Sequence, residues 1–231
     1  MSEFLVSWLQ RLREALSGFL EDDDLERVLS GEPDPEEPPD DRELAEWTAD
    51  MVRRLEQALT PGQVHEVMTS CACRYSRERI ARLRDIYRRT GSVGAVIDEM
   101  WRLHRQGLRD GMMLDDEVVQ RLAELGWGVG GRLQGNTITV TKIPRTANLR
   151  RYMSEDDSEA RRRLYCHCPR VHAAPAEGVR LPKSHCLCGA GYYRYLWQRV
   201  LGCDVTTEVV ESVCSGGDVC TFRIHLPMEV L

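Results

Sequence analysis

Hydrophobic and polar residues follow a helical period through the first half of the chain. Between Phe4 and Phe19, apolar side chains recur every three or four residues, which predicts an amphipathic helix within residues 1–20. The same spacing predicts a second helix over residues 43–59 and four more before Gly126. The front half of the chain is therefore expected to be entirely helical.

The period changes to that of strands in the second half. The stretch NTITVTKI alternates threonine with isoleucine and valine, and RRLYCHCP is interpreted as a second strand that ends at Pro169. A helical stretch, GAGYYRYLWQRVLG, then precedes two strands, DVTTEVVES and VCTFRIHLP, joined by a glycine-containing connection. This order predicts an α+β fold in which the helical N-terminal half packs on a twisted antiparallel sheet.

An acidic, proline-rich segment divides the chain. Residues 21–41 contain eleven acidic residues, one arginine and four prolines. Such a composition cannot bury enough apolar surface to fold alone. We therefore expect an N-terminal helix at 1–20, a mobile linker at 21–42 and one α+β domain at 43–231.

Composition narrows the class of protein. The chain has 231 residues and a net charge of −6, which argues against broad nucleic-acid binding. No stretch approaches the length of apolar residues that a membrane span needs, and charged residues interrupt the first apolar segment, unlike a signal peptide. A cytoplasmic location is expected, where clustered cysteines indicate metal binding or catalysis before disulfides.

Nine cysteines are present, and six of them form three Cys-x-Cys pairs. A zinc ion requires four ligands, and an iron–sulfur cluster requires four thiolates. Two Cys-x-Cys pairs therefore suffice for either, and the sequence does not decide between zinc and a cluster. The alternative is a set of buried, inert thiols. The predicted metal ligands are Cys166, Cys168, Cys186 and Cys188, with Cys71, Cys73, His167 and His185 as additional or substitute ligands.

Local context suggests how each pair presents its sulfur atoms. At a strand end, Cys166 and Cys168 would point the same way and share one centre. Cys186 and Cys188 precede a predicted helix, whose N-terminus favours thiolates. Cys214, in a turn, is a weaker candidate.

Expectations also follow for the remaining cysteines and for a group of aromatic residues. Cys203 and Cys220 are expected to pack in the core, and Cys71 and Cys73 lie at a helix end, where one of the two is expected to face a given site. An aromatic cluster follows the second predicted ligand pair. These rings either line a ligand pocket beside the thiolates or pack against the sheet. The predicted pocket residues are Tyr192, Tyr193 and Trp197.

The C-terminal stretch CLCGAGYYRYLWQRVLGCDVTTEVVESVCSGGDVCTFRIHLP resembles the vinyl-reductase-like (4-vinyl reductase) small-molecule-binding domain. The longer region 61–227, with VMTSCACRYS and YCHCPRV, is similar to bacterial relatives of the aminothiazoline-carboxylate hydrolase family. The resemblance implies an α+β fold that encloses a pocket for a small hydrophobic or heterocyclic molecule. It also implies either a sensor or accessory protein, or a hydrolase that opens a thiazoline ring.

We rank a binding protein first: a sensor or carrier with a cysteine-ligated zinc ion or iron–sulfur cluster. The alternative is an enzyme, either a ring-opening hydrolase or a thiol- or cluster-dependent catalyst. The sequence has no identifiable Ser-His-Asp set, and His167 and His185 are the only imidazoles near the second pair, so no catalytic residue is assigned. The expected partners are a small molecule and, for assembly, a second copy in a homodimer, without nucleic acid or a membrane span.

Overall fold

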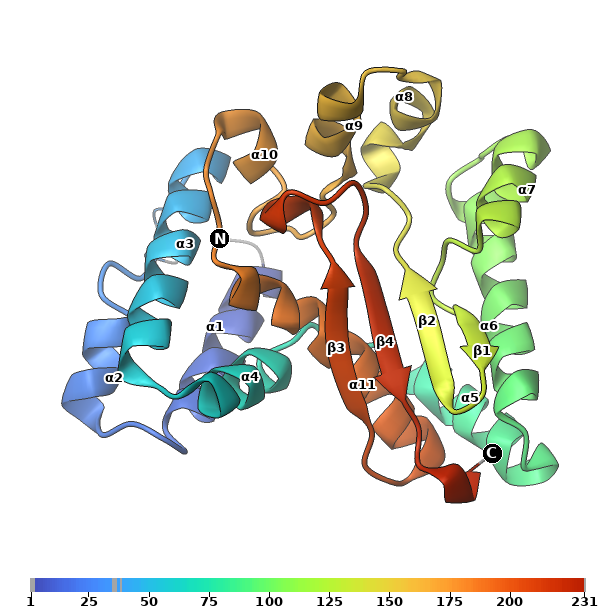
Figure 1. The fold of residues 1–231 in the computed structure, drawn as a ribbon, viewed down its shortest axis with the longest axis horizontal. Coiled ribbons are helices and arrows are strands. Elements are labelled where there is room, and N and C mark those ends of the chain that lie inside the picture. The colour runs from blue at the N-terminus through green and yellow to red at the C-terminus, as the bar shows by residue number, and fades with distance from the viewer. Residues whose placement is uncertain (1–2, 35–36, 38, 231) are drawn as a thin grey trace.

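The computed structural model describes residues 3–34, 37 and 39–230. Helices dominate the first 125 residues, and a four-stranded sheet lies at the centre of the molecule (Figure 1). The α-helices are α1 (Glu3–Leu16), α2 (Asp22–Val28), α3 (Asp41–Ala58), α4 (Pro61–Ser70), α5 (Arg77–Thr90), α6 (Val93–Gln106), α7 (Asp116–Leu125), α8 (Leu149–Ser154), α9 (Ser158–Tyr165), α10 (Ala174–Glu177) and α11 (Leu187–Leu201). The strands are β1 (Arg132–Gln134), β2 (Thr137–Thr141), β3 (Thr206–Glu211) and β4 (Thr221–His225), and two short 3-10 turns matter below, η3 (Lys183–Cys186) and η4 (Val213–Ser215).

The strands form one antiparallel sheet in the order β1-β2-β4-β3. Its alternating apolar residues face α11, which runs along one side of the sheet (Figure 1). Val140 pairs with Phe222 across β2 and β4, and Tyr193 of α11 packs 5.4 Å from the Phe222 ring centroid. The predicted α+β fold is confirmed.

Close approach of two helices fixes α11 in place. A side chain added at Gly191 would overlap the backbone carbonyl oxygen of Thr69, so only glycine lets α11 lie this near to α4. Helix α4 itself begins with a capping box, in which Thr60 and Gln63 exchange side-chain and backbone hydrogen bonds. The contact therefore holds Cys71 and Cys73, which directly follow α4, near the start of α11.

The N-terminal segment differs from the tether expected at residues 21–42. Residues 22–28 form the helix α2, and Leu25 and Val28 are buried in the same apolar cluster as α1, α3 and α4. Trp8 of α1 is fully buried in this cluster. Leu25, Val28 and Leu29 lie on one face at the start of the acidic stretch, which lets this short helix pack while its acids stay outside.

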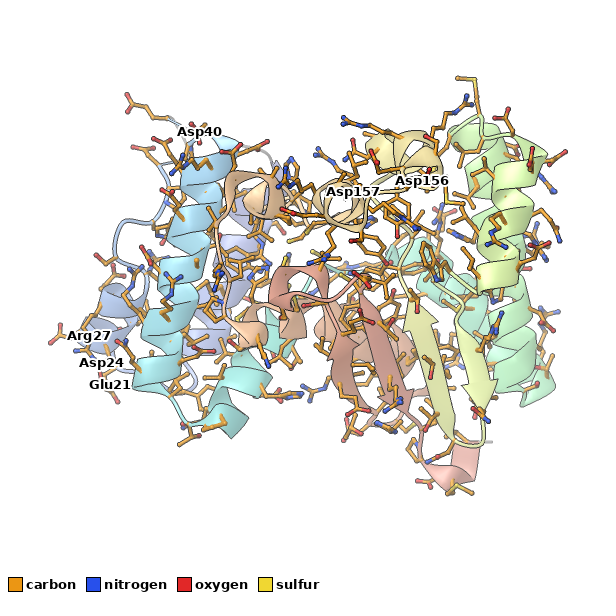
Figure 2. All side chains as sticks on the ribbon, turned by 45° about the horizontal axis from the view of Figure 1, so that its top comes forward. Glu21, Asp24, Arg27, Asp40, Asp156 and Asp157 are labelled. Carbon is orange, nitrogen blue, oxygen red and sulfur yellow. The ribbon has the colours of Figure 1, made fainter. Side chains whose placement is uncertain are left out.

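Figure 2 shows the labelled Glu21, Asp24 and Arg27 at the outer edge of α2. Arg27 and Asp24 form an ion pair of 2.7 Å there.

The strand expected at RRLYCHCP is absent: its first four residues end the helix α9, and the last four follow that helix. Asp157 caps α9 by accepting a 2.7 Å hydrogen bond from the backbone N–H of Ala160, and arginine and leucine are good helix formers. One neighbour of β2 is β4, and the other is the short strand β1, which the sequence pattern did not reveal. Cys166 and Cys168 therefore follow a helix and not a strand.

Among the described residues, no helix combines the length and the apolar character required to cross a membrane.

Candidate functional site: a cavity lined by cysteines

A cavity of about 420 Å³ lies where α11 begins, beside the ends of β2 and β4. Four separate chain segments bring cysteines to its wall: the α4–α5 connection, the loop after α9, the start of α11 and the β3–β4 connection. The cysteines that line it are Cys73, Cys166, Cys168, Cys186, Cys188, Cys214 and Cys220. Seven of the nine thiols of the chain thus face one volume.

The first group of thiols comprises Cys166, Cys186 and Cys214. The sulfur atoms of Cys166 and Cys214 lie 3.8 Å apart. Cys186 is hydrogen-bonded to Cys214 and to Ser212, and Cys166 is hydrogen-bonded to Cys214. These bonds lower the pKa of Cys166 and Cys186, whereas the pKa of Cys214 is raised. The turn η4 therefore brings the thiol of Cys214 next to two thiols of the predicted ligand set.

The second group comprises Cys188, Cys71 and Cys73. Cys188 lies in the first turn of α11, Cys71 ends α4 and Cys73 follows it in the loop. Hydrogen bonds with Cys71 and Cys73 hold the pKa of Cys188 well below its ordinary value, and Arg170 acts in the same direction. The pKa values of Cys71 and Cys73 are raised in turn. Both members of the first Cys-x-Cys pair act on Cys188, and of the two, Cys73 belongs to the cavity lining.

The Cys-x-Cys pairs at 166/168 and 186/188 are each divided between parts of the cavity. Cys168 lies apart from the first group, with its sulfur 3.9 Å from Nε2 of His185. Cys186 directly precedes α11, whereas Cys188 lies within its first turn. Since residues two apart on a helix point about 200° away from each other, the two thiols serve different groups.

Both predicted histidines line the cavity, but they differ in burial. His167 lines the cavity at its exposed edge. His185 is buried, and burial lowers its pKa to about 3, so its ring is neutral. Its Nδ1 atom has no hydrogen-bond partner among the described residues.

Arg170 is the buried cation of the cavity. Its side chain is 1% exposed, and the guanidinium lies 3.6 Å from the centre of the Trp8 ring. Nη2 donates a hydrogen bond of 3.3 Å to the sulfur of Cys188. Nε and Nη1 are buried without a partner among the described residues. Burial works to lower the pKa of Arg170, but nearby sulfur atoms raise it overall, so the group stays charged.

A second cation and several rings form another wall. The Nζ atom of Lys142 lies 5.2 Å from the ring centre of Phe222 and 5.8 and 5.9 Å from those of Tyr192 and Tyr193. All four residues line the cavity, and its described lining includes no aspartate or glutamate. The cavity therefore combines thiols with cations, an environment that favours thiolates and other anions.

Three sequence-based assignments change. Trp197, expected in the pocket, is fully buried in the core against the sheet and does not belong to the cavity lining. Cys220, expected in the core, does line the cavity, and burial raises its pKa to about 12. Cys214, the weaker candidate, meets Cys166 directly.

Arg170 is the main cavity residue that the sequence pattern did not indicate. Arg170 follows the YCHCP stretch by one residue, but only the fold reveals that it is buried.

Within the described ranges, no three His, Cys, Asp or Glu side chains are grouped closely enough to hold a metal ion. The cavity collects all four predicted ligands, and their role in metal binding stays a prediction.

Comparison with known proteins gives one family match. Residues 147–231 match the model of a family of unknown function, DUF6144. This region carries α8 to β4 and six of the seven cysteines that line the cavity. No curated protein and no solved structure matches the chain. The resemblance to vinyl-reductase-like and aminothiazoline-carboxylate hydrolase proteins stays a prediction.

Proposed function

We propose that this chain is a small-molecule sensor or carrier whose cavity binds an iron–sulfur cluster through its cysteines. The observation that carries the proposal is the arrival of seven thiols from four segments at one cavity of about 420 Å³. Thiolates are the ligands that iron–sulfur clusters require, and four are sufficient. The ligand candidates remain Cys166, Cys168, Cys186 and Cys188, with Cys71, Cys73, His167 and His185 beside them.

The distribution of the thiols favours a cluster over a single zinc ion. Ligands of one zinc ion lie at about 2.3 Å from the metal and hence crowd around one point. A cluster spreads its thiolates over several iron atoms, which suits two thiol groups on different walls of a cavity. The sulfur atoms of Cys166 and Cys214, at 3.8 Å, have the spacing of two ligands to one ion. Zinc is therefore the competing outcome of the test.

Charge supports the same proposal. A cluster with four thiolates is anionic, and its burial is costly unless cations lie nearby. Arg170 and Lys142 both line the cavity, without a carboxylate in the described lining. Fully buried, Arg170 would neutralise part of the charge of the thiolates around it.

The organic ligand would occupy the aromatic side of the cavity. Tyr192, Tyr193 and Phe222 supply apolar surface there, with the amine of Lys142 above the rings. Such a mixture of apolar walls and few polar groups is typical of small-molecule sites. A cytoplasmic protein of this kind would sense or carry a small hydrophobic or heterocyclic molecule, as a monomer or a homodimer and without nucleic acid.

The test is anaerobic purification, followed by analysis of metal and sulfide and by visible spectroscopy. We expect iron and acid-labile sulfide in similar amounts with a brown colour, and loss of both in Cys186→Ser. Cys203→Ser is the matched control, because Cys203 lies outside the cavity lining and should keep the cluster. A finding of one equivalent of zinc without colour would indicate a structural zinc ion instead of a cluster. A finding of neither iron nor zinc would reject a metal centre.

A thiol-dependent enzyme is the second candidate, and the contact between Arg170 and Cys188 favours it. An adjacent guanidinium stabilises a thiolate, which is the reactive form of cysteine. Turnover of an aminothiazoline carboxylate that disappears in Cys188→Ser, but not in Cys203→Ser, would place the chain with the ring-opening hydrolases. If protein that contains its cluster shows no turnover, the enzyme hypothesis is rejected and the binding function is retained.

A further inference from the structure

Arg170 has more hydrogen-bonding capacity than its surroundings use. A guanidinium carries five N–H donors. Nη2 donates to Cys188, while Nε and Nη1 are buried and find no partner among the described residues. A buried donor without an acceptor, and above all a charged one, is costly to the folded state. A ligand that offers an acceptor would remove this cost.

The surroundings of Arg170 indicate that the acceptor group of such a ligand is an anion. Trp8 covers one face of the guanidinium at 3.6 Å, and no ion pair links Arg170 to a carboxylate of the described residues. His185 also lines the cavity, and its buried nitrogen atom Nδ1 has no partner among the described residues. Two unsatisfied nitrogen-bearing side chains thus line the cavity wall beside Cys168 and Cys188.

We infer that Arg170 forms an anion subsite in the cavity, and that the small molecule bound there carries an anionic group, such as a carboxylate, placed next to Cys188. Arginine recognises carboxylates through parallel, charge-assisted N–H bonds. The second N–H of Nη2, together with the unpartnered Nε or Nη1, supplies such a pair of donors. The apolar part of the molecule extends toward Tyr192 and Tyr193. This inference rests on the proposed binding function of the cavity but not on the presence of a metal.

Two alkylating reagents of the same shape test the subsite. Iodoacetate and iodoacetamide differ only in that a carboxylate replaces a neutral amide. With either one, the thiolate of Cys188 forms a new S–C bond while the C–I bond breaks and iodide leaves. Both reagents require the same thiolate, so the ratio of their rates at Cys188 reports recognition of the anion and not the pKa of the thiol.

The full-length chain is treated with a chelator, and alkylation of each cysteine is followed by mass spectrometry of peptides. A charge-assisted bond from Arg170 should raise the ratio of iodoacetate to iodoacetamide at Cys188 by about tenfold relative to Arg170→Met. Arg163→Met is the matched control, since Arg163 is exposed and paired with Glu159 away from the cavity. Its ratio at Cys188 should equal that of the unsubstituted chain.

Equal ratios in the unsubstituted chain and Arg170→Met would overturn the inference. So would failure of both reagents to modify Cys188, because a subsite for a small carboxylate must admit one. If Arg170→Met does not fold, sodium acetate and acetamide decide the matter on the unsubstituted chain. Acetate should slow alkylation of Cys188 by iodoacetamide and acetamide should not; no protection by acetate rejects the subsite. If these tests reject the anion subsite while the purified protein contains iron and sulfide, the proposal of a cluster is retained.

Discussion

Several side chains that line the cavity have buried nitrogen atoms without a hydrogen-bond partner among the described residues. Arg170 and His185 are almost completely buried, each with a nitrogen atom that no described residue satisfies. In the interior of a protein, such groups are normally hydrogen-bonded, and exceptions point to a ligand or a functional role. His104 is a third case, since its Nε2 atom is buried without a partner in the described part of the chain and the residue lines the cavity.

His104 should make the stability of the protein depend on pH. Burial lowers its pKa from 6.5 to about 4, with Arg105 as a smaller cause. Between these values the unfolded chain binds a proton that the folded protein does not, so the free energy of unfolding falls as the pH drops from 6.5 toward 4. His104→Gln should reduce the loss between pH 7 and pH 5 by on the order of 1 kcal/mol. Urea denaturation at the two pH values measures this, and parallel losses in both proteins would contradict it.

At the scale of elements, the start of α11 organises the site. Cys186 precedes the helix and Cys188 lies in its first turn, so one helix start contributes to both thiol groups. Close contact of α11 with α4 brings Cys71 and Cys73 to Cys188. The geometry of the second group therefore depends on how near these two helices lie.

Gly191→Ala should disturb this contact. Its methyl group would overlap backbone atoms of Thr69, which cannot move aside as a flexible side chain could. Overpacking of this kind costs about 1–3 kcal/mol of unfolding free energy. We also expect faster labelling of Cys71 and Cys73 by a neutral thiol reagent, because separation of the helices exposes them.

Gly62→Ala is the matched control. Gly62 lies in α4, and nothing lies within 4 Å of the added methyl group. The alanine should raise the unfolding free energy by about 0.5 kcal/mol, since it restricts the unfolded chain. Chemical denaturation of the two variants should therefore give changes of opposite sign, and an unchanged midpoint for Gly191→Ala would reject the tight contact.

At the scale of the whole molecule, the N-terminal helix belongs to the same folded body as the cavity. Trp8 of α1 is fully buried, packs against Trp47 of α3 and lies under Arg170. Arg11 of the same helix donates to the carbonyl oxygen of Cys71 at 3.4 Å. Thus α1 supports the wall of the cavity that holds the cation and the second thiol group.

Trp8→Ala should destabilise the entire protein. Loss of such a large buried side chain costs about 3–5 kcal/mol. Because α1 and the cavity share contacts, we expect one cooperative unfolding transition at a lower denaturant concentration. Phe19→Ala, at a residue that is 40% exposed, should change the unfolding free energy by less than about 0.5 kcal/mol. A separate early transition in Trp8→Ala, with the rest unchanged, would mean that α1 is only an appendage.

The amino-acid sequence alone determined the α+β class, most of the helices and three of the four strands. These features depend on local periodicity, caps and glycines, which act over a few residues and are visible in a single segment. The same local rules missed the short helices α2, α8, α9 and α10 and the strand β1. An arginine-rich helix beside a cysteine pair has no strong apolar period, and a strand of three residues is too short to show alternation.

The tertiary structure decided which cysteines meet. The spacing in the sequence drew attention to Cys166, Cys168, Cys186 and Cys188, and they do share a cavity. Their division between two groups, and the entry of Cys214 into the first, depend on contacts between segments far apart in the chain.

The environment of Arg170 is likewise a property of the fold. In sequence it is one of many arginines, and nothing local tells it from those on the surface. Trp8 of α1 and Cys188 of α11 both contact its guanidinium, which is buried with two nitrogen atoms that have no partner among the described residues. Burial is a sum over contacts from distant segments, which is why no pattern within a short stretch of residues could predict it.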